Sequence, residues 1–432
     1  MGEKSSCGPE IHLNERGGAN RRGFTGRDTG LSFLSKTPLR RELFLLLPLA
    51  GLLLTQIACG GSGGQMSSSG TPGGTMHQYA TGQGPTWVAA ADFNGDKNLD
   101  LAVSNGTDNT VSVLLGNGDG TFRGHVDYPA DTSLWSVAAG DFNGDGKQDL
   151  VVASSFDGLL LGNGDGTFQA MLPLSTRVLD NYSLTVGDLN GDGKPDLVFV
   201  GSADGDQVLL GNGDGTFLAG EDVSYWTDFY PCCVVLGDFN GDSKVDVVLS
   251  ATNHGSGWAI AIPGNGDGSF QFMGFGYYEI GYAEAGSGVV LSDFNGDGKP
   301  DIATGSGFNS SVGLLLGNGD GTFQSPTEFA TGSGTPTAVA VADFNADGKP
   351  DLVVVNGNSL GVNGSNTVSV LLGNGDGTFQ PHVDYPTGQA PTSVAIGDFN
   401  GDGKLDLAIT NQDDNTVSIL LGNGDGTFKS KW

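Results

Sequence analysis

The stretch DFNGDGKLDLAITNQDDNTVSILLGNGDGTF, residues 398–428, decides the fold of this chain. It contains the motif D-x-N-x-D-x-x-x-D at 398–406 and the motif G-N-G-D-G-T-F at 422–428. Short apolar runs at 393–397, 407–410 and 417–421 have the length and alternation of strands. Asn-Gly and Asp-Gly supply the positive φ angles of a tight hairpin. The stretch therefore predicts three strands, a hairpin at 422–426 and a fourth strand that begins at 427–428.

Both motifs recur seven times in strict alternation. The first begins at Asp92, Asp141, Asp188, Asp238, Asp293, Asp343 and Asp398, and the second begins at Gly116, Gly162, Gly211, Gly264, Gly317, Gly373 and Gly422. Successive copies of the first motif lie 47 to 55 residues apart. Four short strands per repeat of this length are typical of a propeller blade. The sequence predicts an all-β, seven-bladed β-propeller of four-stranded blades over residues 76–432.

Residues 76–82, before the first repeat, match the segments that follow two later hairpins, 383–388 and 327–332. The last repeat ends just after its hairpin and lacks most of a fourth strand. We therefore expect the N-terminal segment to supply that strand and close the ring, which removes exposed sheet edges.

The D-x-N-x-D-x-x-x-D segment, here called the metal loop with positions 1 to 9, predicts a cation site. Oxygen ligands at positions 1, 3, 5 and 9, with the backbone carbonyl of position 7, suit Ca²⁺ better than Mg²⁺. Turn formation by Asp, Asn and Gly is the alternative explanation, but it accounts poorly for seven copies with the same ligand positions. Up to seven Ca²⁺ ions are expected. The predicted ligands are Asp92, Asn94, Asp96, Asn98, Asp100, Asp141, Asn143, Asp145, Lys147, Asp149, Asp188, Asn190, Asp192, Lys194, Asp196, Asp238, Asn240, Asp242, Lys244, Asp246, Asp293, Asn295, Asp297, Lys299, Asp301, Asp343, Asn345, Asp347, Lys349, Asp351, Asp398, Asn400, Asp402, Lys404 and Asp406.

Two loops depart from the pattern, because Lys97 and Ser243 replace the position-6 Gly. We expect these two sites to bind more weakly.

The repeat resembles the FG-GAP/VCBS family, the calcium-binding propeller repeats of integrin α-chains and many secreted bacterial proteins. The resemblance covers residues 76–430 and rests on the two motifs quoted above. It implies a seven-bladed propeller with Ca²⁺ in the loop between the first and second strands of each blade. The Phe-Gly…Gly-Ala-Pro pattern of integrins is absent, so the resemblance does not imply an integrin-like partner.

The N-terminal 75 residues have the composition of a leader and tether. Residues 1–39 are polar and aperiodic, and we expect them to be disordered or absent from the mature protein. Residues 40–59 combine Arg40-Arg41 with an apolar run at 43–54, as an export signal does. Ala58-Cys59-Gly60 resembles a lipobox, which makes Cys59 the predicted lipidation site; simple secretion is the alternative. Residues 60–75 are a Gly/Ser tether. The predicted location is the outer membrane or cell surface, or alternatively the periplasm or medium.

The charge of the chain argues against a nucleic-acid partner. Its 432 residues carry a formal charge of −30, whereas nucleic-acid binding needs a basic surface. We expect a monomer that contacts a membrane only through the N-terminal lipid.

The variable loops, which join strands two and three or successive blades, should lie on the face opposite the metal loops. Recognition usually resides in loops that vary on a fixed scaffold. In the third to fifth repeats these variable loops are rich in aromatic residues, Phe229 among them, and contain one histidine. Packing between blades is the alternative role for these side chains. The ligand-face candidates are Tyr225, Trp226, Tyr230, His254, Trp258, Tyr277, Tyr278 and Tyr282.

Two further features leave alternatives open. Cys232-Cys233 could form a vicinal disulfide or remain as two half-buried thiols. Motifs for a serine nucleophile, a zinc protease or a phosphate loop are absent, so the sequence predicts no enzyme. The expected function is an exported, calcium-binding adhesion or binding module for a protein or glycan. A lectin is the alternative, followed by a polysaccharide-acting enzyme.

Overall fold

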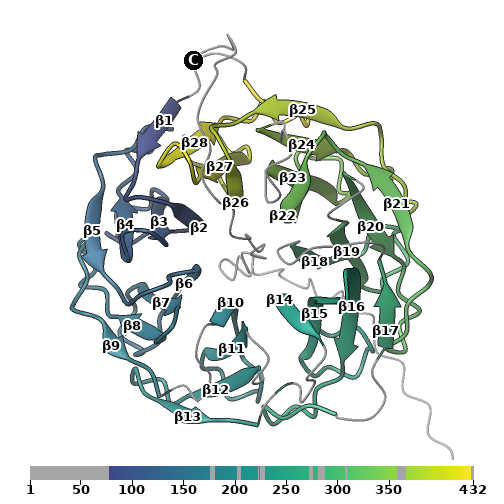
Figure 1. The fold of residues 1–432 in the computed structure, drawn as a ribbon, viewed down its shortest axis with the longest axis horizontal. Coiled ribbons are helices and arrows are strands. Elements are labelled where there is room, and N and C mark those ends of the chain that lie inside the picture. Colours follow the sequence, from purple (N-terminus) through teal and green to yellow (C-terminus); the bar gives the residue numbers. More distant parts are fainter. Residues whose placement is uncertain are drawn as a thin grey trace, which may run out of the picture. The chain divides into compact units, whose positions relative to one another are not determined.

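The computed structural model describes residues 77–175, 181–201, 206–221, 223, 229–271, 276–280, 288–306, 310–357 and 366–429. These residues form seven antiparallel four-stranded sheets arranged as blades around a centre (Figure 1). The first strand of each blade lies nearest the centre and the fourth lies at the rim. The prediction of a seven-bladed propeller is therefore confirmed. No helix long and apolar enough to cross a membrane occurs in this part of the chain.

The blades, numbered I to VII, follow the order of the repeats. Blade I comprises β2 (Pro85–Ala91), β3 (Asp100–Asn105), β4 (Thr110–Leu114) and β5 (Val126–Pro129). Blade II comprises β6 (Ser136–Gly140), β7 (Asp149–Ala153), β8 (Gly158–Leu160) and β9 (Leu172–Pro173). Blade III comprises β10 (Asn181–Gly187), β11 (Asp196–Gly201), β12 (Gln207–Gly211) and β13 (Phe217–Ala219). Blade IV comprises β14 (Tyr230–Gly237), β15 (Asp246–Asn253), β16 (Ser256–Ile262) and β17 (Gly276–Glu279).

The remaining blades repeat this pattern, with one exception at the end. Blade V comprises β18 (Val289–Ser292), β19 (Asp301–Ser306), β20 (Ser311–Leu315) and β21 (Thr327–Ala330). Blade VI comprises β22 (Thr335–Ala342), β23 (Asp351–Gly357), β24 (Thr367–Leu371) and β25 (Val383–Pro386). Blade VII comprises β26 (Pro391–Gly397), β27 (Asp406–Asn411), β28 (Thr416–Leu420) and, as its fourth strand, β1 (His77–Ala80).

The ring closes as the sequence predicts. β1 pairs antiparallel with β28, with His77 opposite Ile419 and Ala80 opposite Thr416. The expectation that a fourth strand begins at 427–428 is wrong in detail: there the chain makes only an isolated bridge between Gly422 and Phe428. The fourth-strand position of blade VII belongs to the N-terminal segment, so the rim of this blade joins the two ends of the repeat region.

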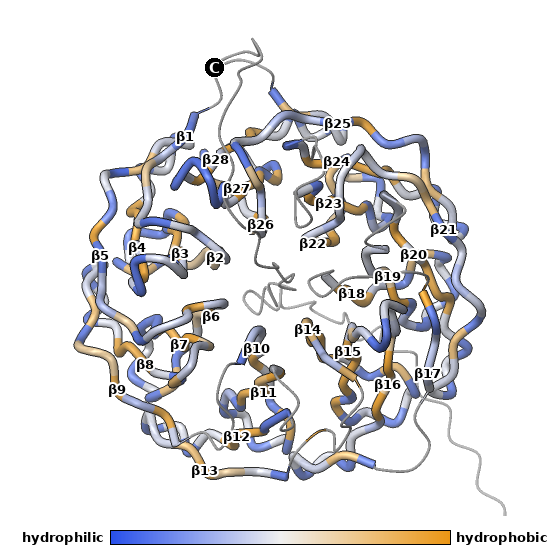
Figure 2. The backbone as a smooth tube through the Cα atoms, in the orientation of Figure 1, coloured by the Kyte–Doolittle hydropathy of each residue, from blue (hydrophilic) through white to orange (hydrophobic). Residues whose placement is uncertain are grey.

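The second and third strands are apolar on both faces because neighbouring blades pack against each side of them. β7 and β20, for example, are buried along their whole length. The fourth strands are mostly exposed at the rim, as the pattern of β5 illustrates. Figure 2 shows hydrophobic residues along many of the strands and hydrophilic residues in many of the turns that join them.

Aromatic rings pack across most blade interfaces. The position-2 Phe of one metal loop meets the hairpin Phe of the next blade, with ring centroids 5.4 to 6.1 Å apart, at Phe399–Phe122, Phe93–Phe168, Phe142–Phe217, Phe239–Phe323, Phe294–Phe379 and Phe344–Phe428. A fourth-strand aromatic adds a second ring at Tyr79–Phe122, Tyr128–Phe168, Tyr278–Phe323, Phe329–Phe379 and Tyr385–Phe428. At the interface of blades III and IV, position 2 is Leu189, which belongs to the same core cluster as Phe270.

Cys232 and Cys233 are free thiols at the start of β14. Both are buried, rather than half-buried, and the Cys232 thiol lies 3.3 Å from the Ser250 carbonyl oxygen. Burial raises the pKa of the Cys233 thiol well above its usual value. The pair is therefore part of the core in this structure.

Candidate metal centre and ligand face

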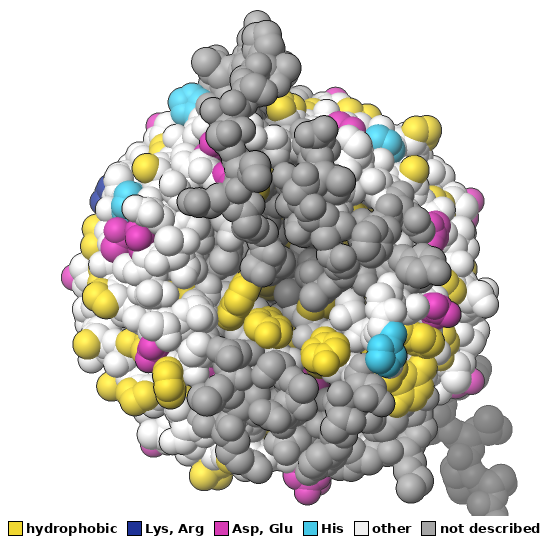
Figure 3. Space-filling model, viewed as in Figure 1, with side chains coloured by type: hydrophobic (Ala, Val, Ile, Leu, Met, Phe, Trp, Pro, Cys, Tyr) yellow, Lys and Arg dark blue, Asp and Glu magenta, His cyan; other side chains and the backbone are white. Residues whose placement is uncertain are grey.

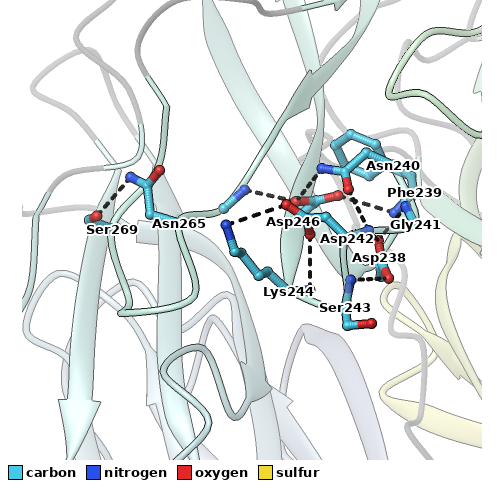
Figure 4. A network of polar contacts seen from close by, with 11 residues as sticks. Asp238, Phe239, Asn240, Gly241, Asp242, Ser243, Lys244, Asp246, Asn265 and Ser269 are labelled. Carbon is cyan, nitrogen blue, oxygen red and sulfur yellow. Dashed lines mark hydrogen bonds and ion pairs between the residues drawn. The ribbon is translucent and has the colours of Figure 1, made fainter. Parts of the chain in front are cut away.

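Each metal loop is held by hydrogen bonds from its own backbone, and the blade IV loop illustrates them (Figure 4). One oxygen of Asp238, at position 1, accepts the N–H of Gly241 at 2.7 Å, and the other accepts the N–H of Ser243 at 2.8 Å. Asn240, at position 3, accepts the N–H of Asp242 through its side-chain oxygen at 2.8 Å. The carboxylate and amide oxygens are thereby turned toward the inside of the loop.

Three backbone bonds recur in all seven loops, whereas the bond from the position-4 N–H to the position-1 carboxylate is present in the loops of blades I, III, IV and V. A position-1 carboxylate oxygen accepts the position-6 N–H at 2.7 or 2.8 Å. The position-3 Asn accepts the position-5 N–H at 2.8 or 2.9 Å. The position-5 Asp accepts the position-7 N–H at 2.9 to 3.1 Å. One loop geometry is therefore repeated around one face of the ring.

The position-9 Asp opens the second strand of each blade and is fully buried. In blade VI, Asp351 accepts the N–H of Phe344 at 2.9 Å through one oxygen and the N–H of Gly373 at 2.7 Å through the other. The equivalent bonds are present in the other six blades. This carboxylate joins the metal loop to the hairpin of its own blade.

Burial raises the pKa of the position-9 carboxyls, because removal from water disfavours the charged form. Two backbone N–H donors oppose this rise, and the other Asp residues of the loop add to it. The pKa rises from 3.8 to about 6 at Asp100, Asp246, Asp301, Asp351 and Asp406. The pKa is also raised at Asp149 and Asp196.

The donor set of the loop fits a hard divalent cation. All the predicted ligands offer oxygen, and a position-9 oxygen that accepts one N–H keeps a further lone pair. The position-7 Lys places its ammonium 3.2 to 3.8 Å from the position-5 carboxylate in six loops, so a cation already neutralises that charge in part. In the described chain, however, no three His, Cys, Asp or Glu side chains converge on one point as a formed metal cluster would.

Three loops hold a residue other than Gly at a positive φ. Lys97 and Ser243, at position 6, have φ values of 73° and 65°, where the other loops have Gly. Ala346, at position 4 of the blade VI loop, has a φ of 57° and was not singled out by the sequence analysis. A side chain in this conformation costs about 1–2 kcal/mol. The sequence does indicate this strained position, because it has Ala where the other six copies of the loop have Gly.

The metal loop of one blade also binds the hairpin of the next. The Phe399 carbonyl of blade VII accepts the N–H of Gly120 in blade I at 2.9 Å. Equivalent bonds join Phe93 to Gly166, Phe142 to Gly215, Phe294 to Gly377, and Phe344 to Gly426. The metal loops and hairpins therefore share one face, as expected, and the loops hold neighbouring blades together.

Replacement of a position-9 Asp is expected to destabilise the fold with or without calcium. Asp351→Ala leaves two buried N–H groups, of Phe344 and Gly373, without an acceptor. The expected loss is about 2–5 kcal/mol of unfolding free energy, measured by denaturant titration in EDTA. The matched control is Asp347→Ala in the same loop, an exposed residue that should cost less than about 1 kcal/mol in EDTA. Equal losses in the two variants would contradict a structural role for position 9.

Metal-free protein is expected to lose stability as pH rises. The folded-state pKa of about 6 at Asp351 lies above its ordinary value of 3.8. The folded state therefore binds more protons than the unfolded state between these values, and stability falls as pH rises from about 4 to 6.5. Thermal melts in EDTA across this range measure the effect. With calcium present the decline should be smaller or reversed, because the cation favours ionised ligands. A melting temperature in EDTA that rises over this range would contradict the raised pKa.

The structure brings together only part of the predicted ligand face. Phe229 lies edge-on to Trp258 with ring centroids 5.9 Å apart, and 5.7 Å from the ring of Tyr277. Tyr230 and His254 are exposed. Tyr225, Trp226 and Tyr282 lie outside the described residues.

Tyr278 does not belong to this face. Its hydroxyl accepts the N–H of Phe323 at 2.9 Å, and its ring packs edge-on against Phe323 in blade V. The alternation of side chains along β17 places Tyr277 and Tyr278 on opposite faces of blade IV. In the repeats, Tyr278 aligns with Tyr128 and Tyr385, which pack in the same way. This alignment in the sequence was the signal that Tyr278 packs between blades.

Solved structures similar in fold include two lectins. A Burkholderia pseudomallei lectin, BP39L, matches with a TM-score of 0.60 at 15% identity, over 80% of this chain and 98% of that one. An Agrocybe aegerita lectin, described as recognising non-reducing terminal N-acetylglucosamine, matches with a TM-score of 0.51 at 19% identity, over 76% and 86%. BBS1N, solved in complex with ARL6DN, matches with a TM-score of 0.54 at 13% identity, over 79% and 93%. At these identities the likeness concerns the fold alone. No curated protein matches the chain by sequence.

A family model of the repeat matches almost the whole propeller. The matched segments are residues 92–152, 153–199, 188–249, 238–304, 293–354, 359–409 and 398–432, each described as an FG-GAP-like repeat. Together with seven metal loops on seven blades, this match establishes that the chain belongs to the FG-GAP-like repeat family.

Proposed function

We propose that this protein is an exported propeller, stabilised by Ca²⁺ in its metal loops, that serves as a binding module for an extracellular glycan or protein. The observation that carries the proposal is the attachment of each loop to its own blade, and of five loops to the next blade as well. Position 9 joins the loop to the hairpin of its own blade, and in five interfaces the position-2 carbonyl binds the hairpin of the next blade. A cation that orders the loops would therefore hold the ring together.

In this proposal, positions 1, 3, 5 and 9 supply side-chain oxygens to Ca²⁺, and position 7 supplies its carbonyl. The bound ion supplies positive charge among three carboxylates that otherwise repel one another. Outside residues 1–59 the chain carries 11 basic and 44 acidic residues, a net charge of −33, and 21 of these acids are loop positions 1, 5 and 9. Seven Ca²⁺ ions would reduce this charge to −19.

The face opposite the metal loops is the proposed binding face, because its loops differ among blades while the metal face is nearly uniform. The aromatic side chains of blade IV favour a glycan ligand, the lectin alternative. The lectins among the similar structures are consistent with this alternative, although they support the fold alone. A polysaccharide-acting enzyme has no comparable support in the described residues.

Binding is tested with the calcium-loaded protein on a glycan array and by capture of proteins from an extracellular fraction. Ligand retention on either supports a binding module. Turnover of pooled polysaccharides would instead indicate the enzyme alternative. Export is tested by locating the protein in cell fractions, and lipidation by mass spectrometry of the mature N-terminus. An unmodified Cys59 in the mature protein would overturn the lipid anchor but not the binding role.

A further inference from the structure

A three-ring aromatic cluster lies at the outer part of blade IV, and Phe229, Trp258 and Tyr277 form it. Tyr277 on β17 is 42% exposed, although its ring contacts that of Phe229. Trp258 on β16 is partly buried against the core cluster shared by blades III and IV. Figure 3 shows a cluster of hydrophobic side chains beside one histidine over β16 and β17. The cluster thus has two partly buried rings and one exposed ring.

Polar groups border this cluster. Glu279 lies directly opposite Trp258 in the β16–β17 pairing and is exposed. Its carboxylate accepts the hydroxyl hydrogen of Ser256 at 3.0 Å, which fixes the position of the acid. His254 is exposed in the turn between β15 and β16. An exposed aromatic ring therefore lies beside an oriented carboxylate and hydroxyl.

The turn that carries His254 is well defined. Asn253 pairs with Ser256, and the two residues between them, His254 and Gly255, have φ values of 48° and 86°. Positive φ at both central residues is the type I′ turn of a two-residue hairpin. Groups on a tight hairpin of long strands are positioned before a ligand arrives, which reduces the ordering cost of binding.

We propose that this cluster is a subsite for an uncharged pyranose sugar, an inference that rests on the binding role proposed above and specifies its ligand class. One face of a pyranose is apolar and can pack on the Tyr277 ring, while hydroxyl groups at its edge can donate to Glu279. A protein surface or a membrane would need a wider apolar area than one exposed ring. The carboxylate of Glu279 and the acidic chain disfavour uronic and sialic acids, because like charges repel.

The test uses the calcium-loaded full chain and saturation-transfer NMR with methyl glycosides of glucose, galactose, mannose and N-acetylglucosamine. Methyl glucuronate is the charged counterpart. We expect at least one neutral glycoside to bind, and glucuronate to bind at least about tenfold more weakly. Tyr277→Ala should weaken binding by at least about tenfold, whereas Tyr277→Phe should retain it. Glu279→Gln should weaken neutral-sugar binding severalfold and reduce the discrimination against glucuronate.

The control is Phe156→Ala, which removes a ring of similar exposure, 54%, from blade II and should leave sugar binding unchanged. Thermal melts of every variant in calcium show whether the fold is intact. Neutral-sugar binding that survives Tyr277→Ala, or glucuronate binding of equal strength, would overturn the subsite. Absence of binding to all these sugars would also overturn it. Protein capture by the same sample would show in that case that the proposed binding role still holds.

Discussion

In EDTA, the melting temperature of this protein is expected to fall by at least about 10 °C relative to that in millimolar calcium. An ion that binds only the folded state stabilises it, and at a free concentration one hundred times Kd each site contributes about 2.7 kcal/mol. Without the ion, three carboxylates within nine residues repel one another, and the position-9 carboxylate is buried without a cation. Bound calcium therefore offsets the repulsion among the three loop carboxylates, including the buried one at position 9.

The effect should extend to the whole ring because the loops contact neighbouring blades. The Phe344 carbonyl, in the blade VI loop, accepts the N–H of Gly426 in blade VII at 3.0 Å, and the Phe344 ring packs against Phe428. Disorder in one loop therefore weakens an interface. We expect one cooperative transition that shifts as a unit with calcium concentration.

The control for this experiment removes one site at a time. Asp347→Ala in blade VI should reduce the number of bound Ca²⁺ ions by one in calorimetric titration, and should reduce the calcium-dependent shift in melting temperature only in part. Magnesium at the same concentration should stabilise less, because it keeps its waters more strongly. Equal melting temperatures in calcium and EDTA would exclude structural calcium.

Removal of the N-terminal strand is the second large effect. Deletion of residues 75–85 should lower the unfolding free energy by about 4 kcal/mol, from one lost aromatic ring and several backbone hydrogen bonds. The deletion removes β1 from the edge of β28 and the Tyr79 ring from Phe122, and it also removes Pro85, the first residue of β2. It also exposes a strand edge, which favours association between chains. Thermal melts and light scattering measure the two consequences.

Two comparisons isolate the role of the strand. Deletion of residues 60–74 leaves β1 in place and should leave the melting temperature unchanged. A synthetic peptide of residues 75–85, added to the truncated protein, should restore part of the lost stability. A truncated protein that melts at the original temperature would show that ring closure by β1 contributes nothing to stability.

The sequence was sufficient to predict the blades, the metal-loop segments and the closing strand. These features depend on local patterns: turn residues at fixed offsets and short alternating runs specify strands and hairpins without reference to distant residues. The match of residues 76–82 to later fourth strands identified β1, because every fourth strand faces the same surroundings. Calcium binding and export remain predictions of the sequence.

The ligand face was less predictable. Tyr277 and Tyr278 are neighbours in sequence, yet one is exposed and the other packs between blades. Register decides between them: Ile260 lies opposite Tyr277 and Ala259 lies opposite Tyr278. A shift of one residue would exchange their faces. Glu279 and Ser256 were not identified, because nothing in their local sequence brings the two together across β16 and β17.

The sequence by itself determined the number of blades, the order of their strands and the residues of each metal loop, because these depend on short-range turn chemistry repeated seven times. The tertiary structure alone decided how the loops act on the ring. Position 9 reaches a hairpin glycine 13 to 22 residues away, and the position-2 carbonyl reaches the next blade. These contacts exist only where packed sheets bring distant backbone groups together, since a buried carboxylate must find its hydrogen-bond donors there.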